Sequence, residues 1–305
     1  MRRKYWKQLR RDLYCDRYLY LFLLPTAILV LVFCYFPFYG ITLAFKSYNG
    51  LTSIMDSPWV GLKYFKMVFQ DPLIPRAFVN TVILGILSIL FCFPAPIFLA
   101  LCFNELQDGK YKKIAQTISY LPYFISTVIV VGMMKEFLSI DGVLNSFIRM
   151  LGARTINFMS SSSAFRSIYI VSEIWQGVGW GSILYLAAIV AVSNEIYEAA
   201  IIDGASRLQR IRFITIPSIL PTISIQLILA IGNLLGASFE KIVLMYSPAN
   251  YATADVLATY IYRNGLQNAN YSYGIAVGVL NSLISFSLVF AANRMMNKLS
   301  GYSFW

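Results

Sequence analysis

Histidine is absent from this chain of 305 residues. The chain therefore has no imidazole base and lacks the commonest metal ligand of proteins, which argues against most zinc and haem chemistry. Cysteine is scarce, and no Cys-x-x-Cys pair occurs, so neither a disulfide framework nor a zinc site is indicated. The four cysteines are Cys15, Cys34, Cys92 and Cys102. We expect no metal site, no cofactor and no catalytic motif in this chain.

Charged side chains are also few. They make up 13% of the residues, about half of the roughly 25% found in soluble domains, and 58% of the residues are hydrophobic. The mean hydropathy is +0.64. These values exclude a soluble globular protein and predict an integral membrane protein. The net charge of +11 comes from basic residues between apolar runs, which is typical of membrane topology, so we expect no nucleic-acid partner.

Six apolar runs are long enough to cross the roughly 30 Å hydrocarbon layer, which takes about 20 helical residues. They lie near residues 19–45, 79–103, 114–134, 168–192, 222–244 and 274–292. The predicted fold is an all-α integral membrane protein with six transmembrane helices. The first run is longer than the core of a signal peptide and ends at no small-residue cleavage site, so we expect it to remain as a span.

Lysine and arginine predict the orientation of the spans. Residues 1–18 hold seven of the 25 basic residues, so this segment is expected in the cytoplasm. An even number of spans then places the tail, 293–305, in the cytoplasm as well, and 15 of the 25 basic residues fall on that side. Residues 46–78 form an extracytoplasmic loop in this scheme, and residues 79–292 form a core of five spans.

The segment between the fourth and fifth runs is polar and is expected in the cytoplasm. It reads Glu198-Ala199-Ala200-Ile201-Ile202-Asp203-Gly204, followed nine residues later by Ile214-Thr215-Ile216-Pro217. Ser193 and Asn194 are good N-cap residues, and we predict a helix over 194–208. The small alanines let another surface approach its backbone. Gly204 either ends the helix or permits a turn within it, and Pro217 and Pro221 are expected to break the helix where the chain re-enters the membrane.

The order Glu-Ala-Ala, three residues, Gly, nine residues, Ile-x-(Leu/Ile)-Pro resembles the signature of the transmembrane subunits of ATP-binding-cassette importers. Every fixed position is present, with Ile216 where leucine is usual. Three further motifs resemble the carbohydrate-uptake branch, within it the subset that imports complex oligosaccharides or polysaccharide fragments. They are Asn80-Thr81, Leu121-Pro122-Tyr123-Phe124-Ile125-Ser126-Thr127 and Ile174-Trp175-Gln176-Gly177.

The resemblance implies a permease subunit with a maltose-transporter-like type I fold in the bacterial cytoplasmic membrane. It implies that the helix over 194–208 is a coupling helix seated in a cleft of an ATPase subunit. The residues assigned to this contact are Glu198, Ala199, Ala200, Asp203, Gly204, Arg207 and Pro217. The implied partners are a second, non-identical permease, two ATPases that bind ATP and Mg, an extracytoplasmic solute-binding protein, an oligosaccharide and membrane lipid. The chain has no Gly-x-x-x-x-Gly-Lys-(Ser/Thr) motif, so it cannot bind ATP itself.

Polar residues within the apolar runs mark a candidate substrate path, because such residues usually face a bundle interior or a water-filled route. The candidates are Glu173, Gln176, Gly177 and Trp180 in the fourth run, Asn233 and Glu240 in the fifth, and Tyr123 in the third. The first four share one helical face, and the two in the fifth run are seven residues apart, so they also share a face. Carboxylates and amides can bind sugar hydroxyls, and an aromatic ring can stack on a pyranose. The alternative is ordinary helix packing through glycine and buried amides.

Three other functions remain open. Gly179-Trp180-Gly181-Ser182 superficially resembles a serine nucleophile of a membrane enzyme, but no histidine exists to activate it, and we expect no lysine inside the spans except at their ends. An ion channel or secondary transporter would leave the signature around Glu198 without a role. A permease of the same class could instead carry peptides or another small solute.

Overall fold

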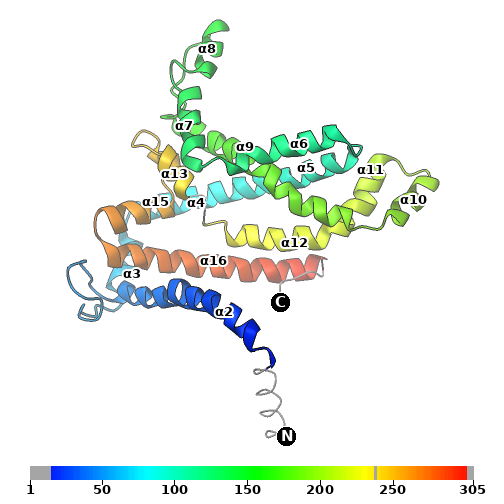
Figure 1. Ribbon diagram of the computed structural model, residues 1–305. Helices are drawn as coiled ribbons and strands as arrows, with labels where there is room; N and C mark the ends of the chain where they lie inside the picture. The colour runs from blue at the N-terminus through cyan, green and yellow to red at the C-terminus, as the bar shows by residue number, and fades with distance from the viewer. Residues whose placement is uncertain (1–14, 237–238, 301–305) are drawn as a thin grey trace.

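A computed structural model describes residues 15–236 and 239–300. Most of this part of the chain is helical, and its long helices lie side by side in one elongated bundle, with shorter elements at both ends (Figure 1). Its only β pairing is the isolated bridge between Lys46 and Trp59. The predicted all-α class is therefore confirmed. The basic residues at 1–14 and the tail at 301–305 lie outside the described residues.

The first two apolar runs form the long helices that were predicted. α2 (Arg17–Val30) continues through a π turn and a 3₁₀ segment to Phe45, giving one helical rod over Arg17–Phe45. The short helix α3 (Lys63–Gln70) follows the first loop. α4 (Ile74–Leu87), a π turn and α5 (Pro94–Glu105) then form a second rod over Ile74–Glu105. Its wide turn precedes Pro94 and Pro96, residues that lack the backbone donor a regular helix uses.

The third and fourth apolar runs are bent. α6 (Lys110–Tyr120) continues as a 3₁₀ turn to Phe124, and α7 (Thr127–Phe137) leaves at an angle of 97°. Ile125 is extended at this break, and the hydroxyl of Ser126 caps the backbone amide of Ile129 at the start of α7. α8 (Val143–Met150) follows. α9 (Ser162–Val190) then makes a 71° bend into α10 (Asn194–Ile202).

The fifth run differs from its prediction. α11 (Arg207–Arg210), a π turn and α12 (Ile216–Gly232) form one rod over Arg207–Gly232, so Pro217 and Pro221 do not break the helix. Pro217 lies in the first turn of α12, where its missing N–H costs little, and the π turn ahead of it absorbs the irregular hydrogen bonding. A continuous span over 222–244 is wrong, because α12 ends at Gly232 and α13 (Phe239–Met245) begins a separate helix.

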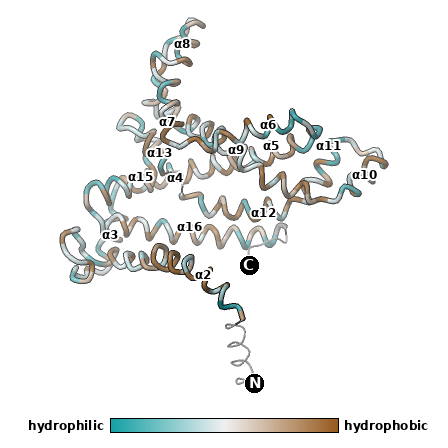
Figure 2. The backbone as a smooth tube through the Cα atoms, viewed as in Figure 1, coloured by the Kyte–Doolittle hydropathy of each residue, from teal (hydrophilic) through white to brown (hydrophobic). Residues whose placement is uncertain are grey.

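The last elements are α14 (Tyr251–Ala254), α15 (Leu257–Ile261), a π turn to Gln267 and α16 (Tyr271–Ser300). Within the described ranges, four helices are long and apolar enough to cross a membrane, or up to six if each bent pair counts as one span. Exposed apolar residues run along these rods, most densely on α2 (Figure 2). This is the pattern of helices that face lipid.

Close backbone approach fixes the centre of the bundle. α5 packs along α9, and α12 packs along α16. At the crossing of α6 and α9, Gly179 lies against the backbone of Ser119, and a side chain at this glycine would overlap that backbone. Gly85 meets Leu234 in the same way. These contacts hold α9 in a fixed position, and α9 carries most of the candidate path residues.

Candidate functional site

A polar cavity of about 640 Å³ lies where the break between α6 and α7 and the break between α12 and α13 meet α9. The backbone at the break between α6 and α7 lines one side, and the start of α13 lines another. Five of the seven predicted path residues line this central cavity: Tyr123, Glu173, Gln176, Gly177 and Glu240. Helix breaks inside a membrane protein occur where the freed backbone lines a cavity. The breaks and the polar cavity are therefore expected at the same place.

Glu173 and Lys241 form an ion pair at the wall of the central cavity. The Nζ atom of Lys241 lies 2.6 Å from Oε1 of Glu173, and the lysine side chain is only 3% exposed. Burying an ammonium group without a counterion is very costly, so Glu173 is what permits a lysine at this depth. The pair joins α9 to α13.

Lys241 was missed in the sequence, where a lysine was expected only at the ends of the spans. The signal was present, because Glu240 and Lys241 stand next to each other in an otherwise apolar stretch. A charged residue inside such a stretch is expensive and demands a partner. In one continuous helix Glu240 would face the path and Lys241 would face away from it. The break before α13 means that this continuous helix does not exist.

Gln176 holds the break between α6 and α7. Its side-chain Nε2 donates to the carbonyl oxygen of Ile125 at 2.9 Å. That carbonyl belongs to the extended residue at the bend, so the amide stabilises a backbone shape that a regular helix would not need. Gly177, one residue further along α9, has no described atom within 4 Å of the position a Cβ would take, so it keeps this part of the cavity open.

Trp180 does not line the central cavity. Its ring stacks on that of Tyr123, with 4.7 Å between the centroids and 5° between the planes, and Phe124 meets the tryptophan edge-on. Both stacked residues remain 45% exposed. The three rings therefore form one aromatic group at the rim, where Tyr123 and Phe124 reach the cavity.

Asn233 and Glu240 do not share one helical face, because the helix ends between them. Asn233 follows the end of α12 and lines a neighbouring polar cavity of about 430 Å³, together with Gly236. Glu240 lines the central cavity instead. Glu173 borders both cavities, so these two polar spaces adjoin at its carboxylate.

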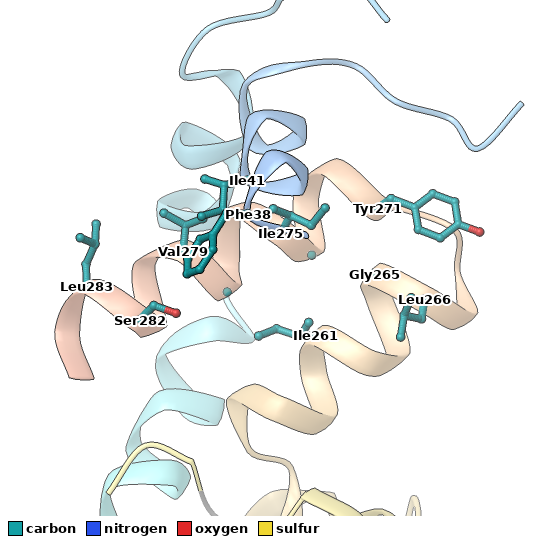
Figure 3. Close-up of a pocket in the computed structure, with 12 residues that line it drawn as sticks. Phe38, Ile41, Ile261, Gly265, Leu266, Tyr271, Ile275, Val279, Ser282 and Leu283 are labelled. Carbon is teal, nitrogen blue, oxygen red and sulfur yellow. The ribbon is translucent and has the colours of Figure 1, made fainter. Parts of the chain in front are cut away.

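An apolar hollow between the first rod and α16 has a different lining. Its volume is about 600 Å³, and Figure 3 shows that Phe38, Ile41, Ile275 and Val279 point into it. Hydroxyl groups of a sugar would find almost no hydrogen-bond partner there, so this hollow is not part of the polar site.

The segment around Glu198 lies at the far end of the bundle. α10 and α11 project beyond the long helices, away from α3 and α15 (Figure 1). Ser193 caps the amide of Glu195 as predicted, and the helix expected over 194–208 ends at Ile202. Gly204 follows with a φ of +79°, so it ends the helix with a left-handed turn, one of the two predicted roles.

Most of the predicted contact residues are accessible. Glu198, Ala199, Asp203, Gly204, Arg207 and Pro217 are exposed, and Ala200 is half-buried. Exposed isoleucines accompany them, with Ile202 at 85%. The hydroxyl groups of Tyr197 and Thr215 lie 3.0 Å apart and tie α10 to the base of α12. An exposed helix with a mixed apolar and charged face is suited to docking a protein surface.

Ser182 cannot act as the nucleophile of a membrane enzyme. Its side chain is fully buried in α9, and its hydroxyl donates to the carbonyl of Gly179 at 2.6 Å. The hydroxyl therefore serves the helix backbone. Among the described residues, no group of three or more cysteine or acidic side chains could hold a metal ion.

Residues 68–300 match the family described as binding-protein-dependent transport system inner membrane components. The chain is 42% identical over 284 residues to Protein LplB of Bacillus subtilis, covering 93% of this chain and 89% of that protein. It is 41% identical over 293 residues to the polygalacturonan/rhamnogalacturonan transport system permease protein YteP of the same organism, covering 96% of this chain and 91% of that protein.

A solved structure gives a similar result. One chain of a bacterial alginate ABC transporter, crystallised with an alginate pentasaccharide-bound periplasmic protein, matches with a TM-score of 0.89 and 43% sequence identity. The match covers 97% of this chain and 99% of that chain. The likeness therefore extends over the whole described bundle.

Proposed function

The chain belongs to the family of binding-protein-dependent transport system inner membrane components, and from this premise we propose that it forms half of an oligosaccharide path. Partner ATPases drive the transport, and this permease subunit converts their movement into alternating access. The observation that carries the proposal is the pairing of a polar cavity at two helix breaks with an exposed α10 at the end of the bundle.

The cargo follows from the cavity and from the relatives. The central cavity offers carboxylates, an amide and three aromatic rings, which are groups that bind the hydroxyls and the apolar face of a sugar. The names of the relatives refer to polygalacturonan, rhamnogalacturonan and alginate, all of them polysaccharides. An oligosaccharide is therefore favoured over a peptide or another small solute.

The energy comes from outside the chain. The exposed residues of α10 dock in a cleft of an ATPase subunit, and the closure of two ATPases around ATP and Mg moves the helix. A ligand can shift a protein between two states only through contacts that differ between them. α10 supplies such a contact, because the 71° bend joins it directly to α9 and hence to the cavity.

In the proposed topology the four straight rods, the bent pair of α6 and α7, and α9 without α10 each form one span, which gives six spans in the bacterial cytoplasmic membrane. Both termini and α10 are cytoplasmic, and α3, α8 and α15 face outside. A second, non-identical permease completes the path, and a solute-binding protein delivers the cargo to the outer loops. The basic residues at 1–14 support this orientation through their charge alone.

Uptake by the complete importer in proteoliposomes tests the function. The probes are oligogalacturonides, alginate oligosaccharides, cello-oligosaccharides and, as a non-sugar, tetrapeptides. We expect ATP-dependent uptake of at least one saccharide and none of the peptides. Glu198→Lys should abolish uptake, whereas Glu105→Lys, at the exposed carboxylate that ends α5, should not. Peptide uptake alone, or uptake without ATP hydrolysis, would refute the proposal.

A further inference from the structure

A third polar pocket lies at the end of the bundle opposite α10. We name it the outer pocket and define it by Tyr64, Gln70, Asp71, Tyr260, Asn264 and Asn270. Its volume is about 400 Å³, within the usual range of ligand sites. α3, the π turn after α15 and the start of α16 supply its walls, so segments far apart in the chain build it together. No residue of the outer pocket belongs to the central cavity.

The floor of the outer pocket is a fixed carboxylate. Asp71 accepts hydrogen bonds from the hydroxyls of Tyr260 and Tyr273, the second at 2.7 Å, and from the backbone amide of Leu73 at 2.9 Å. Both tyrosines are buried. Four hydrogen-bonding groups from three segments thus hold one another in place, which makes the floor rigid.

The rim of the outer pocket carries free amides. Gln70 and Asn270 are exposed, and within the described ranges neither side-chain amide has a hydrogen-bond partner. Asn270 follows Ala269, whose φ of +55° is rare for a residue other than glycine. Its backbone amide donates to Asn264 at 3.3 Å, so this turn holds Asn270 at the rim. Each free amide offers both a donor and an acceptor.

We propose that the outer pocket binds one sugar unit of a long saccharide through its hydroxyl groups, before that unit reaches the central cavity. This inference rests on the proposed function. Amides, phenols and a carboxylate are suited to hydroxyls, which both donate and accept. The pocket lining contains no cation, and Asp71 would repel a sugar carboxylate, so the ligand is a hydroxylated face of the saccharide. The nearby Arg263 already forms an ion pair with Asp255 at 2.7 Å.

Uptake of saccharides of increasing length tests the proposal. Under the proposal a long saccharide occupies the outer pocket and the central cavity together, whereas a short one does not, so loss of the rim amides should affect long cargo selectively. The double variant Gln70→Ala and Asn270→Ala should lower the uptake of hexasaccharides about threefold to tenfold at subsaturating concentration, as expected for one or two lost hydrogen bonds. Uptake of disaccharides or trisaccharides from the same series should remain unchanged.

The matched control is Gln267→Ala. This residue is an exposed amide on the π turn that carries Asn264, but it does not line the outer pocket, so its loss should leave every length unaffected. Equal losses at all lengths would overturn the proposal and indicate contact with the solute-binding protein instead. No loss at any length would also overturn it. Failure of the unaltered importer to take up any saccharide would refute the proposed function itself, so the two failures are distinguishable.

Discussion

Replacing Lys241 by methionine tests whether the ion pair with Glu173 stabilises the central cavity. The lysine is 3% exposed and the glutamate 26%, so the substitution takes the paired ammonium away from a largely buried carboxylate. Breaking a buried pair in this way costs roughly 3–5 kcal/mol. Because Glu173 borders two cavities that can admit water, we expect the lower end, about 3 kcal/mol. This corresponds to a melting temperature lower by roughly 6–12 °C.

Thermal unfolding of the purified importer measures this effect. The double variant Glu173→Gln and Lys241→Met removes both charges, so it should recover most of the lost stability. Lys112→Met is a control, because its 2.8 Å pair with Asp108 has one partner 94% exposed, and an exposed pair contributes about 1 kcal/mol or less. If the double variant were no more stable than Lys241→Met, the buried charge would not explain the loss and the reasoning would be refuted.

Three further predictions concern the ends and the centre of the bundle. Gly204→Asp should abolish uptake while membrane insertion persists. The control Gly61→Asp should leave uptake intact, since Gly61 has a similar backbone conformation and equally open surroundings but lies far from α10. Equal uptake by both variants would contradict the docking role. Gly179→Ala should cost about 1–3 kcal/mol in thermal unfolding, because the new methyl group overlaps the backbone of α6, and Gly177→Ala should cost less. Partial burial raises the pKa of Asp71, but hydrogen bonds from two tyrosine hydroxyls and a backbone amide lower it below its ordinary value. The stability that the Asp71 carboxylate contributes is therefore present at neutral pH and is lost as the pH falls below about 4. The fall in melting temperature on acidification should be smaller in Asp71→Asn. An equal fall in both proteins would argue against this role.

Hydropathy predicted the class and most of the long helices, because membrane crossing demands length and apolar composition above all. The first, second and sixth predicted runs lie within single helical rods. Residue types predicted the cap at Ser193 and gave the end of α10 at Gly204 as one of two possibilities, since both depend on local chemistry. These features require no knowledge of distant segments.

The helix breaks required such knowledge. Asn233 and Gly236 looked like interior residues of one span, but α12 ends at Gly232, and Leu234 in the break packs closely against Gly85 of another rod. The partner of Lys241 lies 68 positions earlier in the sequence, on α9. Trp180 was expected to face a sugar, but it stacks on Tyr123 because the bend after α6 brings that ring across. Tertiary packing decided all three.

The proposed function depends on contact between α10 and a nucleotide-hydrolysing subunit, and photo-crosslinking detects such a contact. A photoreactive amino acid replaces Glu198 in the complete importer in its membrane, with Leu51, 90% exposed in the loop that follows the first rod, as the control position. We expect an adduct with the ATPase subunit from position 198 and none from position 51, with a yield from position 198 that changes when ATP is added. The absence of that adduct, or labelling of position 198 by an impermeant reagent applied outside intact cells, would contradict the account.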